Sequence, residues 1–486
     1  MLIKNNLRAN LSIAFVAITL LHATVLSASE ILGDGPRLLP EDRISQQQIE
    51  NGEKTLSEIR AAGLTIFATP FNKHDGFGDG PHDLTVPDQR SAAAGNRPTL
   101  QGNGSFLRVN GLDAQSCLEC HAIVSNRTVP ATLGIGGLGG INTSAMFQPA
   151  AMSAADTDFD GRAEFDGRLI NPPFIFGAGG VELVAREMTQ DLQRRKRLAL
   201  RRPGTRVELE TKGVYFGSIV ASSDGTIDTQ DIEGIDADLV VRPFGRKGDV
   251  ASLRRFDINA LAFHMGMQAN EAFGGSFADA DNDGVSNEIS KGDLSALTIF
   301  LSTLERPTEE HMPGTHPGER LFHRIGCAEC HVPTMQTART ILPSTFADAP
   351  ETPFTGVFYE IDLTEPPTSF DRNETGGIEV RMFSDLKRHD MGDALTESFS
   401  LASTEQNRQF MTARLWGVAD SDPYMHDGRA LTLVDAIRMH DNPGSEASDA
   451  ARRFEAMDVQ RKNSLLEFLL TLRTPRDPAD DLLPAR

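Results

Sequence analysis

The chain has 486 residues, a length that suits two or three domains, and its 68 acidic and 47 basic side chains give a formal net charge of −21. This excess of acidic residues argues against nucleic acid or an anionic membrane surface as a partner, and favours a soluble partner with a basic docking face. Only four cysteines are present, and all four fall in two short motifs.

Residues 1–29 have the three parts of a secretory signal peptide. Lys4 and Arg8 form the positive start, Leu11–Leu26 form the apolar run, and small residues at 27–29 stand near a cleavage point. A membrane anchor is disfavoured because the apolar run is short and contains His22. We therefore expect a periplasmic protein with no membrane span after signal removal.

The first element of the mature chain is predicted to be a helix over Ser45–Phe67, where apolar residues recur at helical spacing. Its end places Gly63 four residues before Phe67. The second half of the chain repeats this spacing in Gly318 and Phe322. The repeat predicts an opening helix of the same kind in each half.

Two further segments, residues 295–307 and 463–475, also match each other. Both are apolar, both end in proline, and Phe300 in the first corresponds to Phe468 in the second. We expect them to be closing helices that cross the opening helices, with the glycine allowing close approach.

Each half carries the motif Cys-x-x-Cys-His. The motif occurs at Cys117, Cys120 and His121 and again at Cys327, Cys330 and His331. Such a motif is typical of covalent c-type haem attachment, in which two thioether bonds hold the porphyrin and the histidine ligates the iron. A dithiol redox pair or half of a zinc site would not require the adjacent histidine. The sequence thus predicts two covalently bound haem c groups.

These features predict a mainly α-helical chain with two cytochrome c-like haem domains in tandem, long loop insertions and a small β insertion. The predicted signal peptide covers 1–29, the first haem domain with its insertions covers 30–307, the second haem domain covers 308–475, and a tail covers 476–486. Alternating apolar and polar residues around an Asp224-Gly225 turn place the β insertion at residues 205–241.

Two acidic loops have the alternating oxygen ligands that calcium requires. Asp279, Asp281 and Asp283 precede Gly284, and residues 156–161 have the same form. Neither loop has the complete twelve-residue pattern, so a solvated acidic turn is an equal alternative to a calcium site.

Residues 414–440, with Pro-Tyr-x-His-Asp-Gly followed by Thr-Leu-x-Asp-Ala, resemble bacterial di-haem cytochrome c peroxidases. Together with residues 244–256 and 384–392, they resemble most closely the di-haem oxidoreductase branch of that superfamily, once called thiol oxidoreductases. The resemblance covers most of the mature chain and is more specific in the second half. It implies one haem in each of two cytochrome c domains, with calcium between them in some members.

In that family, a side chain from the helix after His-Asp-Gly closes the second haem. Matching Asp435-Ala436-Ile437 to the family places His440 at that position, and helical geometry puts His440 on the same face as Ile437. A surface histidine at a helix C-terminus is the alternative. Because family members use methionine or tyrosine here, a histidine pair implies a lower haem potential.

The first haem differs in this alignment. Pairing Ser252 with Thr432 places Ala260 where His440 stands in the other half, so the resemblance implies an open position for a small oxidant. His264, one turn later, is either a removable sixth ligand or a structural histidine.

The resemblance also implies a carboxylate over the open haem for proton transfer. Glu182 is the first candidate, with Glu187 and Asp257 as rivals and a helix-surface role as the alternative. Trp416 is expected to be a packed indole or an electron relay, and His426 and Arg429 are expected to support haem propionates.

The expected activity is peroxidase-like. Hydrogen peroxide or a similar oxidant would be reduced at the first haem with electrons relayed by the second, from an electron-donor redox protein or a small oxidisable substrate. The alternatives are an electron-transfer cytochrome with both haems six-coordinate, or haem oxygenase-like oxidation of an organic or protein substrate.

Overall fold

The structure is a computed structural model, and it describes residues 36–78, 114–121, 123, 146–153, 164–173, 175–273, 279, 283–346, 350–396 and 404–475. The predicted signal peptide, the tail at 476–486, the acidic loop at 156–161 and Asp281 lie outside the described residues.

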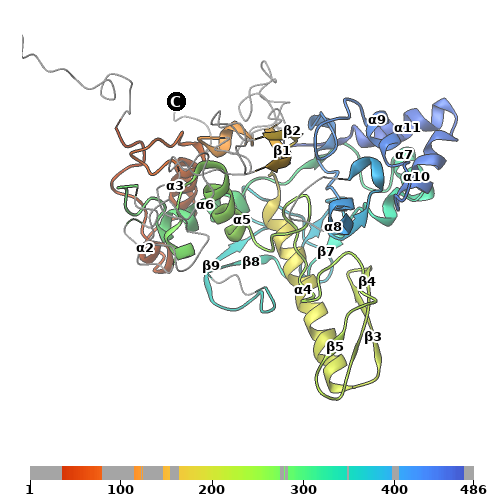
Figure 1. Cartoon of the computed structure of the whole chain (residues 1–486), viewed down its shortest axis with the longest axis horizontal. Helices are drawn as coiled ribbons and strands as arrows, with labels where there is room; N and C mark the ends of the chain where they lie inside the picture. The colour runs from red at the N-terminus through yellow and green to blue at the C-terminus, as the bar shows by residue number, and fades with distance from the viewer. Residues whose placement is uncertain are drawn as a thin grey trace, which may run out of the picture.

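The described residues form helices joined by long irregular segments, with several small antiparallel sheets (Figure 1). The helices are α2 (Gln46–Glu50), α3 (Leu56–Ala68), α4 (Ala178–Arg201), α5 (Leu253–Ala260), α6 (Lys291–Ser302), α7 (Pro317–Arg324), α8 (Thr404–Arg408), α9 (Leu433–Met439), α10 (Ser448–Glu455) and α11 (Val459–Leu469). The strands are β1 (Met146–Ser153), β2 (Glu164–Ile170), β3 (Arg206–Thr211), β4 (Val214–Ala221), β5 (Ile227–Asp228), β6 (Thr308–Glu309), β7 (Met335–Gln336), β8 (Ile341–Thr345), β9 (Val357–Asp362), β10 (Glu379–Val380), β11 (Arg388–Asp390), β12 (Gln409–Met411) and β13 (Leu472–Arg473). This confirms the expectation of a mainly helical chain with small sheets.

The opening helix of the first half is shorter than predicted. Instead of one helix over Ser45–Phe67, the chain forms α2 and α3 with a break between them. Gly52 adopts a left-handed φ of 68° after α2, and Thr55 then caps α3 by accepting a hydrogen bond from the Glu58 amide. Apolar periodicity continues across this break, which is why the sequence pattern did not reveal it.

The predicted helix crossing is confirmed in both halves. A Cβ atom on Gly63 of α3 would lie 2.2 Å from the Ala296 carbonyl oxygen of α6, and one on Gly318 of α7 would lie 2.0 Å from the Ser464 oxygen of α11. The two helix pairs therefore touch backbone to backbone, at equivalent positions of the repeat. They lie at opposite ends of the body in Figure 1.

An aromatic pair seals each crossing. The ring centroids of Phe67 and Phe300 are 5.7 Å apart, and those of Phe322 and Phe468 are also 5.7 Å apart. All four side chains are almost completely buried. The same contact at the same spacing supports the interpretation of the chain as a duplicated unit.

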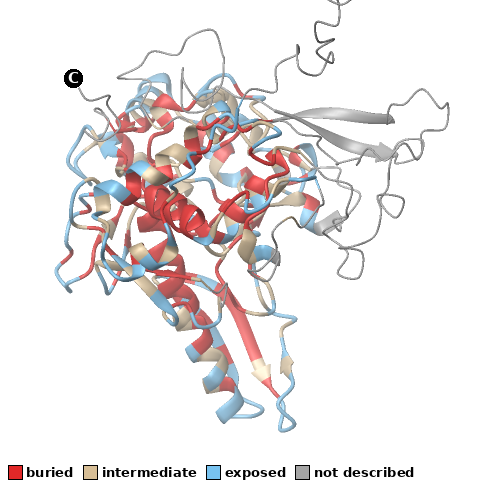
Figure 2. Ribbon diagram, turned by 90° about the vertical axis from the view of Figure 1, so that its left-hand side faces the viewer, coloured by how far each residue is buried: buried red, intermediate tan, exposed pale blue. Residues whose placement is uncertain are grey.

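The β insertion predicted at residues 205–241 is present as the antiparallel sheet β3-β4-β5. It lies along α4, and the two together extend from the body as an arm, whose far end is exposed (Figures 1 and 2). At the base of the arm, Lys212 donates to Glu187 over 2.7 Å, and Glu187 also accepts from the Ala338 amide. These contacts fix the arm to the second half of the chain.

The division between the two hydrophobic cores does not coincide with the division between the two halves. The larger core contains buried side chains up to Leu304 together with side chains from 335–386. The smaller core contains residues of α7 and α11. The short strand β6 pairs with β13, so the chain joins the second half at Thr308. The domain boundary between 307 and 308 stays a prediction, and side chains from 335–386 pack with the first half.

We predict that Gly318→Ala destabilises the protein by about 1–3 kcal/mol, because the added methyl group would force α7 away from α11. Denaturant unfolding followed by circular dichroism would measure the change. Gly52→Asn is the control, since that glycine has open space around it and asparagine tolerates a positive φ. Equal midpoints for the two variants would contradict the proposed close contact.

Candidate haem sites

Both Cys-x-x-Cys-His motifs adopt the same turn. A 3-10 turn spans Cys117–Glu119 in the first and Cys327–Glu329 in the second. In each, the histidine amide donates to the carbonyl of the first cysteine over 2.9 Å. None of the four cysteines is in a disulfide, and burial raises the pKa of the Cys327 thiol to about 12 and that of Cys117 as well. Neutral thiols are unlike the low-pKa thiolate of a redox-active dithiol.

Each motif histidine is oriented by a carbonyl from a distant segment. Nδ1 of His121 donates to the Pro173 carbonyl over 2.9 Å. Nδ1 of His331 donates to the carbonyls of Phe383 and Ala413 over 3.2 and 3.1 Å. A carbonyl can only accept, so Nδ1 carries the proton and Nε2 keeps a free lone pair, as a metal-ligating imidazole requires.

Burial lowers the pKa of both motif histidines to about 4. The rings are therefore neutral at ordinary pH, which is the protonation state that ligates iron. The donor set and its orientation fit a haem at each motif.

His440, the predicted second ligand, lies near the second motif. It ends α9, its Nδ1 donates to the Ala436 carbonyl over 2.7 Å, and burial lowers its pKa. It is also close enough to His331 to lower the pKa of that residue electrostatically. Three histidines thus use Nδ1 in the same way and leave Nε2 available.

The alignment between α5 and α9 is reproduced by their caps. Ser252 accepts from the Arg255 amide at the start of α5, and Thr432 accepts from the Asp435 amide at the start of α9. Ala260 on α5 therefore occupies the position that corresponds to His440 at the end of α9.

The chain then departs from the repeat, because a π-helical turn, Leu261–Met265, follows α5. This turn places His264 close enough to His121 to affect the pKa of His121. Such turns often occur at functional positions. A second histidine is thus near the motif histidine in both halves.

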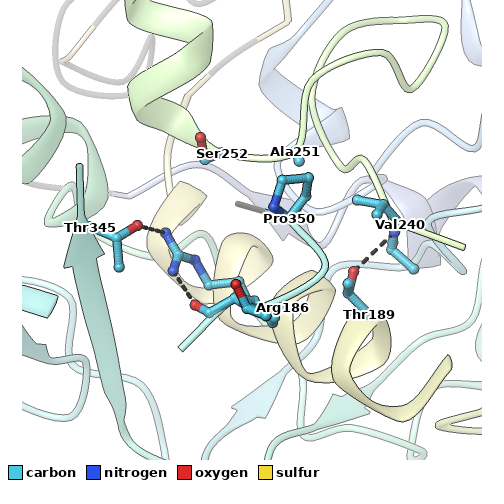
Figure 3. A pocket seen from close by; sticks show the side chains of 10 residues that line it. Arg186, Thr189, Val240, Ala251, Ser252, Thr345 and Pro350 are labelled. Atoms are coloured by element: carbon cyan, nitrogen blue, oxygen red, sulfur yellow. Dashed lines mark hydrogen bonds between the residues drawn. The ribbon is translucent and has the colours of Figure 1, made fainter. Parts of the chain in front are cut away.

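Glu182, the first candidate for proton transfer, is engaged in the fold. Its carboxylate accepts from Arg186 over 2.8 Å and from the Leu253 amide over 2.9 Å, so it fixes the start of α5. Arg186 donates in turn to the Pro353 carbonyl, beside a small pocket that also borders Ser252 (Figure 3). The proton-transfer role of Glu182 stays a prediction. Its rival Glu187 is bound to Lys212 and Ala338.

Asp257 has a different environment. It lies on α5, is 3% exposed, and accepts a hydrogen bond from Thr298 of α6 over 2.6 Å. Burial raises the pKa of Asp257 to about 8. Asp257 is also close enough to Cys117 of the first motif to raise the pKa of that thiol electrostatically. It is a buried carboxyl group that exchanges its proton near neutral pH.

A cluster beside Cys330 was missed by sequence reasoning. His389 donates to Asp385 over 2.8 Å and to Glu446 over 2.7 Å. Burial opposes the charged ring, but hydrogen bonds with Asp385, Cys330 and Glu446 raise the pKa of His389 to about 12. Cys330, Asp385 and His389 lie close enough to hold a metal ion. Both ring nitrogens of His389 donate protons, however, so the cluster is an ion-pair network around the second motif. His389 lies within the family-like segment 384–392, which was the available signal.

One loop connects the two sites. Asn171 donates through its backbone amide to the His426 carbonyl and through its side chain to the Pro423 carbonyl. Two residues later, Pro173 orients His121. The histidine of the first motif is thereby held by a loop anchored on the Pro-Tyr-x-His-Asp-Gly segment of the second half.

The remaining candidates have structural contacts. Trp416 is 4% exposed and its ring lies against Gly177 at the start of α4. His426 stacks on Phe410, with ring centroids 4.5 Å apart, and Arg429 pairs with Asp427.

The acidic loop is only partly described. Asp279 accepts from the amides of Asp283 and Gly284, which is the geometry of a closed turn. Calcium binding by Asp279, Asp281 and Asp283 stays a prediction.

The two motifs and their second histidines have the residue types of a haem oxidoreductase. Residues 373–472 match the sequence model of a family described as "Di-haem oxidoreductase, putative peroxidase". The matched stretch includes His440 and the carbonyls of Phe383 and Ala413. The resemblance inferred from the sequence is thereby confirmed over these residues, and it supports a di-haem oxidoreductase.

A search of curated proteins gave no match. Among solved structures, a chain of Kuenenia stuttgartiensis hydrazine synthase, pressurised with xenon, is 16% identical, with 91% of this chain and 97% of that chain covered and a TM-score of 0.30. A MauG-like protein associated with microbial copper homeostasis is 15% identical, with coverages of 59% and 88% and a TM-score of 0.27. At these TM-scores neither likeness bears on function. None of the helices in the described part of the chain combines the length and apolar character of a membrane span.

We predict that His440→Ala converts a low-spin ferric signal into a high-spin one, since the second motif would lose its far ligand. Electron paramagnetic resonance of the oxidised protein would measure this. His323→Ala, which removes an exposed histidine of α7, is the matched control. A low-spin signal that survives in His440→Ala would show that the ligand assignment is wrong.

Proposed function

We propose that this protein is a periplasmic di-haem c-type oxidoreductase with peroxidase-like activity, built from two cytochrome c-like domains. The observation that carries the proposal is the paired arrangement of histidines: His121 with His264, and His331 with His440. The family match over residues 373–472, which include His440 and the carbonyls that orient His331, supports it. Bound haem would supply the electron transfer and the cleavage of the O–O bond.

The two sites would divide the work. His331 and His440 are both held through Nδ1, so they suit a closed site that only passes electrons. At the first site, Ala260 leaves the α-helical position without a ligand, and His264 lies on the π-helical turn beyond it. We propose that His264 closes this site at rest and withdraws when a small oxidant such as hydrogen peroxide binds.

Proton supply is the further requirement. Reduction of hydrogen peroxide to two water molecules consumes two electrons and two protons. Asp257 can deliver a proton, because its carboxyl group is protonated at neutral pH, lies near Cys117, and is oriented by Thr298. Of the three carboxylates considered, it is the one without a basic side chain hydrogen-bonded to it in the described part of the chain.

The second candidate function is an electron-transfer cytochrome with both haems six-coordinate. The presence of His264 near His121 favours it, since both sites would then have two histidine ligands. The proposed partners are an electron-donor redox protein with a basic face, or a small oxidisable substrate, given the net charge of −21. Export by the signal peptide and a calcium ion at the 279–283 loop also belong to the proposal.

Peroxide turnover by the reduced protein tests the activity directly. We expect turnover in the wild type and, in His264→Ala, a high-spin signal from the first haem together with faster reaction with peroxide. His74→Ala is the control, because His74 is exposed in the same half. Two low-spin haems without any peroxide reaction in the wild type, and no gain of peroxide reaction in His264→Ala, would favour the electron carrier.

We predict that Asp257→Asn lowers kcat for peroxide reduction about 100-fold or more. In the wild type, the rate should fall as pH rises through about 8, because Asp257 then loses the proton that it donates. Stopped-flow rates across pH 6–10 would measure this. The variant should lack that decline.

Glu182→Gln is the comparison for this prediction. If it abolished the pH-dependent step while Asp257→Asn kept it, the roles of the two carboxylates would be reversed.

A further inference from the structure

Arg414 is adjacent in sequence to a residue that orients the histidine of the second motif. It follows Ala413, whose carbonyl accepts from Nδ1 of His331 over 3.1 Å. Its guanidinium donates to the Pro243 carbonyl over 3.1 Å, so it reaches across to the first half of the chain. The side chain therefore lies at the junction between the two halves, beside the second site.

The charge of Arg414 is not balanced by a carboxylate in the described residues. Burial lowers the pKa of Arg414 to about 10, and burial is the whole cause of the shift. Other arginines behave differently: the buried Arg186 and Arg254 pair with Glu182 and Glu271, and the half-buried Arg381 pairs with Glu309. Arg414 is half-buried, and a cation partly withdrawn from water without a counterion is costly, which indicates that an anion completes the site.

A second donor lies two residues along the chain. Nε1 of Trp416 is buried and has no hydrogen-bond acceptor in the described part of the chain. Residues of the other half hold the indole in place, because its ring lies against Gly177. Pro307 lies against the same glycine. The guanidinium has N–H groups besides the one bonded to Pro243, and together with the indole N–H they suit a carboxylate.

We infer that Arg414, with the indole N–H of Trp416, binds a carboxylate, and that this carboxylate is a propionate of the second haem. The inference rests on the proposed function, since the porphyrin brings the propionate. The bond to Pro243 then ties the edge of the second porphyrin to the first half. Arg429, which the sequence suggested for this role, already has Asp427 as its partner.

The test is redox potentiometry of Arg414→Gln and Arg414→Lys, both purified with two covalent haems. A cation near the propionate favours the reduced iron. We therefore expect Arg414→Gln to lower the midpoint potential of the second haem and to strengthen its dependence on pH between 5 and 8, with the first haem unchanged. Arg414→Lys should keep most of the wild-type behaviour, which separates charge from packing. Arg438→Gln, an exposed arginine of α9 paired with Glu455, is the control.

The outcomes separate the inference from the proposed function. Wild-type potentials in an Arg414→Gln protein that carries both haems would overturn the inference alone. Titration with formate covers a free carboxylate as the other source: a spectral change in the wild type that is lost in Arg414→Gln would overturn the propionate assignment. Protein without covalent haem would overturn the proposed function and this inference with it.

Discussion

The proton on Nδ1 of each motif histidine is the constraint on which both sites depend. Because that proton is held by a backbone carbonyl, the ring cannot rotate freely and Nε2 keeps its lone pair. The carbonyls come from Pro173 and Ala413, each far from its histidine in sequence. The fold therefore determines how each histidine points, and the five-residue motif alone does not.

The two halves share a framework and differ where chemistry would differ. Both use a glycine at the crossing of the first and last helices. Both also cap a helix between these two with a hydroxyl side chain, Ser252 on α5 and Thr432 on α9. The difference follows that helix: α9 ends in His440, whereas α5 continues into a π-helical turn. A small change in winding at one helix end thus distinguishes two otherwise equivalent sites.

Local patterns in the sequence were sufficient to predict the helix crossings, the β insertion and the alignment of Ala260 with His440. They were insufficient where contacts depend on distant segments. His389 pairs with Glu446, 57 residues away, and no periodicity relates the two. The role of Glu182 depended on family likeness, and its partner Arg186 lies one turn further along the same helix, where it could have been considered. The high burial of Asp257 arises from packing between α5 and α6, which the sequence does not specify.

The shared core has a consequence for how such a chain can change. Side chains between Met335 and Leu386 complete the interior of the first half, although they follow the second motif in sequence. A fragment starting near Thr308 would leave these apolar side chains without their neighbours, and the remaining fragment would lose part of its interior. The two repeats are therefore not interchangeable modules. Recombination that exchanged one of them would also have to exchange the segment 335–386 and the first-half residues that pack against it.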